Sequence, residues 1–182
     1  VTELQIALAK LGFTAEEIAN ATPGVVKFAT AVGADLGAAA KVAGVAVRAF
    51  GLHTLETEAA VASLAIGTTK SALAFADYET ILSTVGPVAR AYGFTLEDVI
   101  ALTGKLRDAG FDASKASTAL RNIFLNLADA NGALAQKIGG AAESMPDLVE
   151  KLIALDEAGI GLSETLEVTD KRSVAAFIQL LK

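Results

Sequence analysis

The sequence predicts an all-α protein, an irregular array or bundle of about eight to ten short-to-medium helices with no sheet. Apolar residues recur at helical spacing along the whole chain, and glycine, proline and cap-forming residues separate the patterned segments. Hydrophobic residues make up 53% of the chain and aromatic residues only 5%. Alanine supplies much of the apolar content, and it is the best helix former.

The first predicted helix covers residues 2–11, where apolar side chains recur at i, i+3, i+4 and i+7. Gly12 offers a left-handed stop after this helix. Thr14 and Glu17 then form a capping box, in which each side chain accepts a hydrogen bond from the backbone amide of the other residue. This box predicts a short helix that ends near Asn20.

The pair Thr22-Pro23 predicts a new helix start, because proline at the first helical position loses no hydrogen bond. This third helix is expected to run to residue 32 and to end at Gly33. Asp35 is the predicted cap of the next helix, which ends at residue 50.

A glycine–apolar–cap element recurs at the predicted helix ends, and each copy holds a helix end, a reversal and a helix start. Thr95 with Asp98 is a further capping box, and Phe94 is expected to pack onto Val99 as a hydrophobic staple. The glycines of the four copies are Gly12, Gly51, Gly93 and Gly110. The first three lie about 40 residues apart, near the period of helical solenoids. The side chains between them do not repeat, which favours an irregular array over a regular solenoid.

The remaining elements follow from weaker signals. Residues 67–77 are either helical or a break, because Gly67 weakens the pattern. Turns are expected within 129–145, a helix over 145–158 and a last helix over about 170–182. We therefore divide the chain into a helical core, 1–128, and a helical C-terminal part, 129–182, which can belong to the same domain.

Composition argues against several classes of function. The chain contains no cysteine, which excludes disulfides and thiolate chemistry. Its net charge is −6 and its basic residues are scattered, so no basic stripe indicates nucleic-acid binding. Mean hydropathy is +0.50, but the longest uncharged run, 59–69, is too short to span a membrane. The absence of an initial Met and the mid-helix ending at Lys182 indicate a fragment of a longer protein.

No residue pattern indicates catalysis, a cofactor or a metal. His53 is the only histidine, and beside Gly51 it is expected to serve as a cap or surface residue. Paired carboxylates such as Glu16 and Glu17 fall in first helical turns, where negative charge complements the helix dipole. We predict that the chain is not an enzyme and binds no cofactor.

Residues 118–128 form an apolar helix that includes Leu120 and Phe124 and is interrupted by Arg121. Arg121 either lies on the solvated face, or its guanidinium caps neighbouring helix C-terminal carbonyls or pairs with a carboxylate such as Asp108 or Asp112. We regard Leu120, Arg121 and Phe124 as structural or interaction candidates, together with the joint glycines, Thr14 and Thr95.

Four blocks in this chain resemble, in order, the phage tail tape measure proteins of the minor tail protein family. The blocks begin at Ala21, Val85, Asp108 and Asp170, and the most recognisable is Thr118-Ala-Leu-Arg-Asn-Ile-Phe-Leu-Asn-Leu-Ala. Ser117 departs from the family pattern, where glycine is usual, and Thr169-Asp170 stands where the family has Phe-Gly. Residues 129–165 match poorly.

The resemblance implies one folded domain of a longer molecular ruler that acts in virion assembly and tail length determination. It implies other tail proteins as partners (tube, chaperone and tip) and self-association as a further option, while the scattered basic residues predict no nucleic-acid partner. It places the protein in the virion tail, and in the host cytoplasm during assembly, with membrane contact only during ejection. The alternatives are a helical adaptor that binds peptides and, with less support, a cell-wall hydrolase-associated or membrane-active segment.

Overall fold

The computed structural model describes residues 2–129, 132–137, 140, 144–159 and 173–181. Over these residues the chain forms α-helices and two short 3-10 segments, without a strand, which confirms the all-α prediction. The elements are α1 (Thr2–Lys10), α2 (Ala15–Val32), α3 (Leu36–Phe50), η1 (Thr54–Glu56), α4 (Thr57–Lys70), η2 (Phe75–Asp77), α5 (Tyr78–Ala91), α6 (Leu96–Asp108), α7 (Ala113–Ala128), α8 (Ala133–Lys137), α9 (Met145–Glu157) and α11 (Val174–Leu181).

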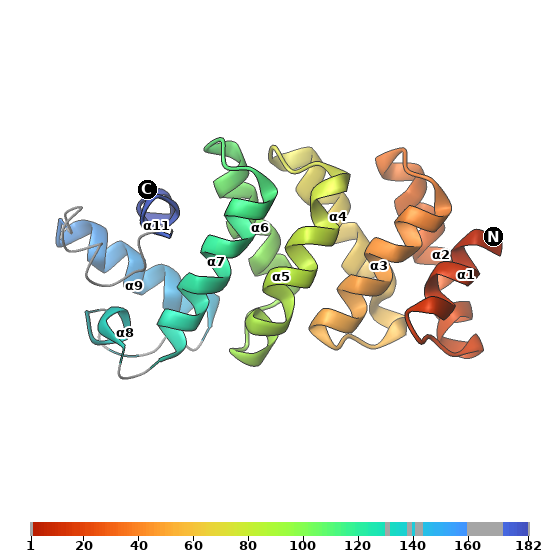
Figure 1. The fold of residues 1–182 in the computed structure, drawn as a ribbon, viewed down its shortest axis with the longest axis horizontal. Coiled ribbons are helices and arrows are strands. Elements are labelled where there is room, and N and C mark those ends of the chain that lie inside the picture. Colours follow the sequence, from red (N-terminus) through yellow and green to blue (C-terminus); the bar gives the residue numbers. More distant parts are fainter. Residues whose placement is uncertain (1, 130–131, 138–139, 141–143, 160–172, 182) are drawn as a thin grey trace.

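The first seven helices stack in two layers, and the chain alternates between them (Figure 1). In one layer α3 packs between α1 and α5, and α5 packs against α7. In the other layer α4 packs between α2 and α6. The glycines at 12, 51 and 93 follow α1, α3 and α5, so their spacing of about 40 residues is the length of one helical hairpin.

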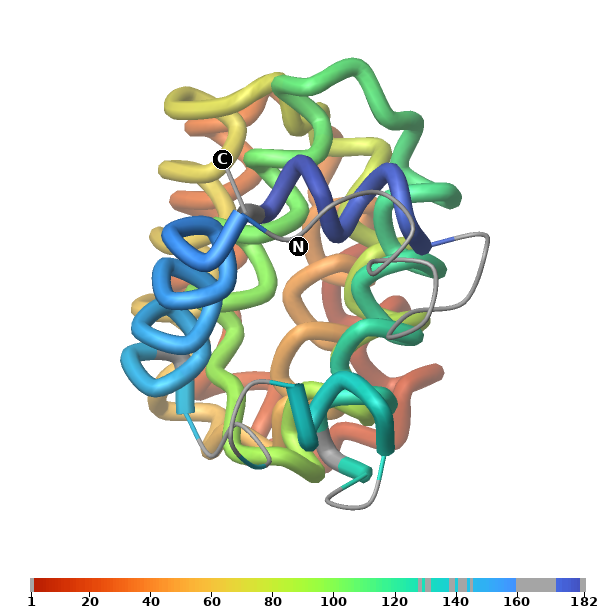
Figure 2. Tube along the Cα trace, turned by 90° about the vertical axis from the view of Figure 1, so that its left-hand side faces the viewer, coloured from red at the N-terminus to blue at the C-terminus, as the bar shows by residue number. Residues whose placement is uncertain are grey.

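The alternation stops after α7. Helix α8 packs on α7, whereas α11 lies against both α6 and α7, and α9 packs against α11 (Figure 2). One buried hydrophobic cluster extends from Leu4 in α1 to Leu180 in α11. Tyr78 is the largest fully buried side chain, and its hydroxyl donates a 2.6 Å hydrogen bond to the Leu64 carbonyl. This bond satisfies the polar end of a ring that is otherwise packed in the core.

The predicted helix break at Thr22-Pro23 is wrong, because α2 runs through Pro23 without interruption. Pro23 and Ala19 are exposed, so the carbonyl that loses an amide partner to the proline faces the solvent side. The next residue, Gly24, is buried against α4, where a Cβ would lie 3.0 Å from the Cα of Glu58. Packing of Gly24 against α4 therefore holds a helix that local sequence rules would end.

The regions with weaker sequence signals include 67–77 and the segments after residue 129. Helix α4 continues through Gly67 to Lys70, and a break at 71–74 follows, so both alternatives for 67–77 occur in part. The helix predicted over 145–158 is α9. The last predicted helix is described over Val174–Leu181, and its expected start near 170 lies outside the described residues, as do Asn131 and Gly139 of the predicted turns.

Candidate interaction surface

The four joint glycines share one backbone geometry. Gly12, Gly51, Gly93 and Gly110 have φ values of 79°, 64°, 78° and 89°, in the left-handed region that favours glycine. The amide of the following residue reaches back to the helix: Phe13 donates to Leu8 (3.2 Å) and Phe94 to Ala89 (2.9 Å). An apolar residue in this position covers the last turn of the helix that it closes. The apolar residue after each glycine therefore belongs to the preceding helix end as well as to the next helix start.

Both predicted capping boxes are present. Thr14 Oγ1 accepts from Glu17 N (3.2 Å), and Glu17 Oε2 accepts from Thr14 N (2.8 Å). Thr95 and Asp98 form the same pair of bonds, at 3.2 and 2.8 Å. The hydrogen bond from Thr14 N is the main reason that the pKa of Glu17 is lowered, and the neighbouring Arg48 lowers it further against the opposing effect of desolvation.

His53 occupies the corresponding place in the joint between α3 and α4. Its Nδ1 accepts from Leu55 N (3.2 Å), and Glu56 Oε2 accepts from His53 N (2.6 Å). One residue separates Gly51 from His53, as one separates Gly12 from Thr14 and Gly93 from Thr95. The single histidine is thus a cap residue, one of the two structural roles expected for it.

An arginine three residues before a joint glycine reaches the joint one hairpin earlier. Arg48 donates to the Gly12 carbonyl (2.9 Å), forms an ion pair with Glu17 (3.2 Å), and its guanidinium lies 4.1 Å from the Phe13 ring centroid. The Arg90 guanidinium lies against Gly51, where it leaves no room for a Cβ. We call this arrangement the arginine clasp.

Arg107 extends the clasp to the other layer. Its Nε lies 3.1 Å from Asp77 Oδ2 in η2, an ion pair rather than a directed hydrogen bond, and its Nη1 donates to the Phe111 carbonyl (2.7 Å). The adjacent Asp108 accepts from Ala72 N (2.6 Å) in the same preceding joint. Sequence reasoning missed all three arginines, although their constant offset from Gly51, Gly93 and Gly110 was a signal.

The candidates in α7 divide into core and surface. Leu120 and Phe124 are fully buried, and the Phe124 ring stacks on Phe94 with centroids 4.3 Å apart and an interplanar angle of 7°.

Arg121 is exposed. The two carboxylates considered as its partners are engaged elsewhere: Asp108 accepts a hydrogen bond from Ala72 N in the α4–α5 joint, and Asp112 caps α7 by accepting from Lys115 N (2.9 Å). That hydrogen bond is the main cause of the lowered pKa of Asp112. Of the two roles considered for Arg121, this placement agrees with the solvated face.

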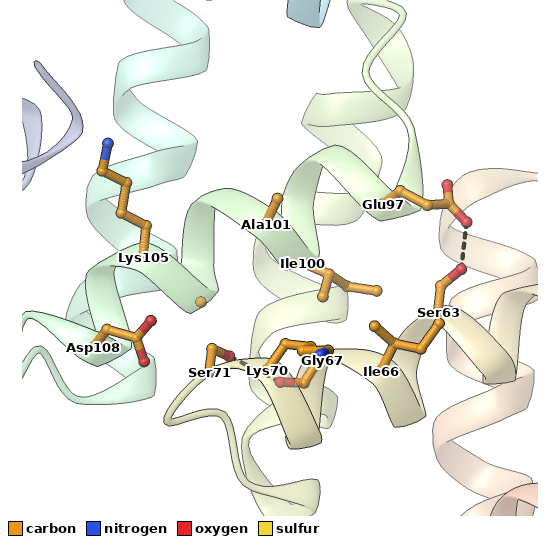
Figure 3. A pocket seen from close by; sticks show the side chains of 11 residues that line it. Ser63, Ile66, Gly67, Lys70, Ser71, Glu97, Ile100, Ala101, Lys105 and Asp108 are labelled. Atoms are coloured by element: carbon orange, nitrogen blue, oxygen red, sulfur yellow. Dashed lines mark hydrogen bonds between the residues drawn. The ribbon is translucent and has the colours of Figure 1, made fainter. Parts of the chain in front are cut away.

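An open groove of about 420 Å³ lies between α4 and α6 (Figure 3). Ile66, Ile100 and Ala101 contribute apolar surface, and Ile66 remains 58% exposed. Two helical glycines, Gly67 and Gly104, belong to the same groove. Lys70, Lys105, Asp108 and Glu97 complete its charged rim. Sequence reasoning could not find the groove, because its two walls are about 30 residues apart in the chain.

The structure offers little support for other kinds of site. Among the described residues, no cluster of three or more His, Asp or Glu side chains could hold a metal ion. Within that same part of the chain, no single helix is long and apolar enough to cross a membrane. Helices α2 and α3 together have the length and apolar composition of a membrane span, but the chain bends by 118° between them.

The fold and the groove define a two-layer α-helical array with an open apolar surface, a class that proteins use as scaffolds and binding surfaces. A family model described as "phage-related minor tail protein" matches residues 1–181. The chain belongs to this family of structural phage tail proteins. It is 30% identical over 164 residues to a tape measure protein of Pneumococcus phage Dp-1. The match covers 86% of this chain but spans only 14% of that relative's length. No solved structure matches the chain.

Proposed function

We propose that this chain is a folded assembly domain of a tape measure protein, which contributes to tail assembly and length determination through contacts with other tail proteins. The observation that carries the proposal is the open apolar groove on a packed two-layer array, in a chain of the phage minor tail family. Such a surface suits protein–protein association, because apolar patches on folded proteins commonly mark partner sites. The partners are tube, chaperone or tip proteins, or further copies of this chain. They meet the domain in the host cytoplasm during assembly and remain with it in the virion tail.

The domain itself supplies little of the length that a ruler measures. A continuous α-helix rises about 1.5 Å per residue, so 182 residues in that form would span about 270 Å. Neighbouring helices in a packed layer lie only about 8–10 Å apart, and each hairpin of this stack advances by about that distance. The stack is therefore a compact fixed segment, and length depends on the rest of the parent protein.

Deletion of the domain from the parent phage tests the proposal. We expect few or no complete infectious tails in electron micrographs, because the deletion removes an assembly contact. Infectious tails of normal length would contradict the proposal. Infectious tails shortened by about 270 Å would also contradict it, because they would show that this segment measures length as an extended helix. A deletion of equal length in a segment outside this domain is the control.

A helical adaptor remains the second candidate, and the groove supports it as well. An adaptor would bind its peptide outside the tail and independently of assembly. The deletion separates the two, because loss of an adaptor would leave tails complete.

A further inference from the structure

We propose that the groove between α4 and α6 binds an amphipathic helix of another tail protein, antiparallel to both walls, with acidic residues in its first turn and basic residues in its last. The inference rests on the proposed function and specifies the chemistry of one partner. It follows from the apolar floor, the length of the groove and the order of the charges along it.

Helix α4 has apolar residues on both of its faces. Val61 and Leu64 are buried in the core, whereas Ala62 and Ile66 are exposed on the opposite side. A helix at a protein surface normally presents polar residues to water. A second apolar cleft of about 320 Å³ lies between α2 and α4 and also includes Ile66. The exposed side of α4 thus forms an apolar ridge between two clefts, as expected of a helix that another element covers.

The groove has the length of a short helical contact. Helices α4 and α6 run parallel, since Ser63 bonds to Glu97 near one end and Ala72 bonds to Asp108 near the other. Its rim extends from Glu97 to Asp108, eleven residues of α6 or about 17 Å at the helical rise. Helix-in-groove complexes use anchors at i, i+4 and i+7, which cover about 10 Å.

The charges give the groove a direction. Lys70 and Lys105 lie at the end where α4 and α6 finish (Figure 3). Lys105 Nζ is 3.4 Å from the Leu180 carbonyl, and Asp108 at the same end has one oxygen engaged by Ala72 N. Glu97 lies at the opposite end, where it accepts a 2.7 Å hydrogen bond from Ser63.

An antiparallel helix matches this direction in two ways. Its amino terminus would meet the carboxyl ends of α4 and α6, which gives a favourable alignment of helix dipoles. Acidic residues are common in first turns and basic residues in last turns. Acidic residues in the first turn would then face Lys70 and Lys105, and basic residues in the last turn would face Glu97.

Binding of two designed peptides to the 182-residue chain tests the proposal. Both peptides are helical, about four turns long, with leucine anchors at i, i+4 and i+7. One has glutamates first and lysines last, and the other has the reverse order. We expect fluorescence anisotropy to show at least about fivefold tighter binding of the glutamate-first peptide at low salt. Equal binding of the two peptides, or no binding of either, would overturn the proposal.

Two variants and their matched controls locate the site. Ile66→Asp should weaken binding of the glutamate-first peptide at least about tenfold, and Lys70→Glu should remove the preference for that peptide. Leu55→Asp, at an apolar residue that is 69% exposed outside the groove, and Lys10→Glu, on α1, should leave binding unchanged. Equal effects of Ile66→Asp and Leu55→Asp would overturn the assignment. Circular dichroism verifies that each variant is folded.

The outcomes also separate this inference from the proposed function. If neither peptide binds but deletion of the domain still prevents tail assembly, the helix-binding groove is wrong and the assembly role stands. If Ile66→Asp instead abolishes a dimer seen by sedimentation equilibrium, a second copy occupies the groove and the inference is overturned.

Discussion

The cap residues of this chain accept the same kind of hydrogen bond at equivalent joints, but they do so with different chemical groups. Thr14 and Thr95 use a hydroxyl as the acceptor, and His53 uses an imidazole nitrogen. The amide needs only an acceptor at the correct distance, so the residue type can vary while the geometry repeats.

The equivalence of these caps predicts the effect of substitutions at His53. His53→Ala should lower the free energy of unfolding by about 1 kcal/mol, because the Leu55 amide loses its acceptor. His53→Thr should restore most of the loss. Urea denaturation measures both, with Thr69→Ala as the control at an exposed helical position. Equal destabilisation by Ala and Thr would show that the ring contributes by packing and not as a cap.

The lowered pKa of Glu17 predicts the pH dependence of stability. A carboxyl whose pKa falls on folding stabilises the protein above its ordinary value of 4.5, and this contribution is lost as pH falls through the lower folded value. Asp112 acts in the same direction, from an ordinary value of 3.8. The contribution of Glu17 to the free energy of unfolding should therefore stay constant between pH 7 and 5 and decline below about pH 4.5. Glu17→Gln should flatten that decline in acid denaturation curves; an unchanged slope for Glu17→Gln would contradict this account.

At the scale of the element, helices in the same layer approach closely where glycine faces the neighbour. A Cβ on Gly24 would meet the Glu58 backbone at 3.0 Å, and one on Gly86 would lie 2.8 Å from the Ala49 Cβ. Glycine in a helix interior costs about 1 kcal/mol relative to alanine. The close packing that it permits must outweigh this cost.

Gly24→Ala should therefore destabilise the protein despite the higher helix propensity of alanine. We expect a loss of about 1–3 kcal/mol, because backbone atoms of α4 cannot move aside as a flexible side chain can. Gly37→Ala is the control, since its nearest neighbour is a side-chain atom, the Asp35 carboxylate oxygen at 3.3 Å, and not backbone. Thermal and urea unfolding would measure the difference. A Gly24→Ala variant as stable as the Gly37→Ala variant would contradict the close-approach argument.

The stacked pair Phe94 and Phe124 links the joint before α6 to α7. Phe124→Ala should cost about 3–5 kcal/mol through the cavity it leaves. Phe124→Leu should cost clearly less, because leucine refills part of the volume. Denaturation of the two variants checks the order, and Leu125→Ala, at a residue 37% exposed on the same helix, is the control. A loss at Phe124 no larger than at Leu125 would contradict the role of the stack.

Local signals predicted most element boundaries in this chain. Glycine with an apolar neighbour and a cap located the ends of α1, α3 and α6, and the capping boxes located the starts of α2 and α6. The prediction at Pro23 was wrong because burial of Gly24 against α4 is a long-range effect. The two layers, the arginine clasp and the groove all depend on which helices are neighbours. Spacing within one helix does not contain that information.

At the scale of the whole molecule, the division at residue 128 remains a prediction. The hydrophobic cluster contains Leu148 of α9 and Phe177 of α11 together with residues of the first seven helices. We therefore expect one cooperative unfolding transition in calorimetry, with equal van't Hoff and calorimetric enthalpies. Two separable transitions would show that residues 129–182 form a second domain. A variant such as Phe177→Ala should lower the temperature of the whole transition, because its ring is fully buried in the shared core.

The arginine clasp bears on how such chains change size. Arg48 and Arg90 each reach the joint one hairpin earlier, and the hairpins share the same glycine and cap positions. A duplicated hairpin of about 40 residues would bring its own arginine and its own acceptor joint, so the clasp could form again at the new junction. The loss of one hairpin would leave the next arginine facing an equivalent joint. Gene duplication and deletion could thus lengthen or shorten this domain in whole hairpins while each joint keeps its clasp.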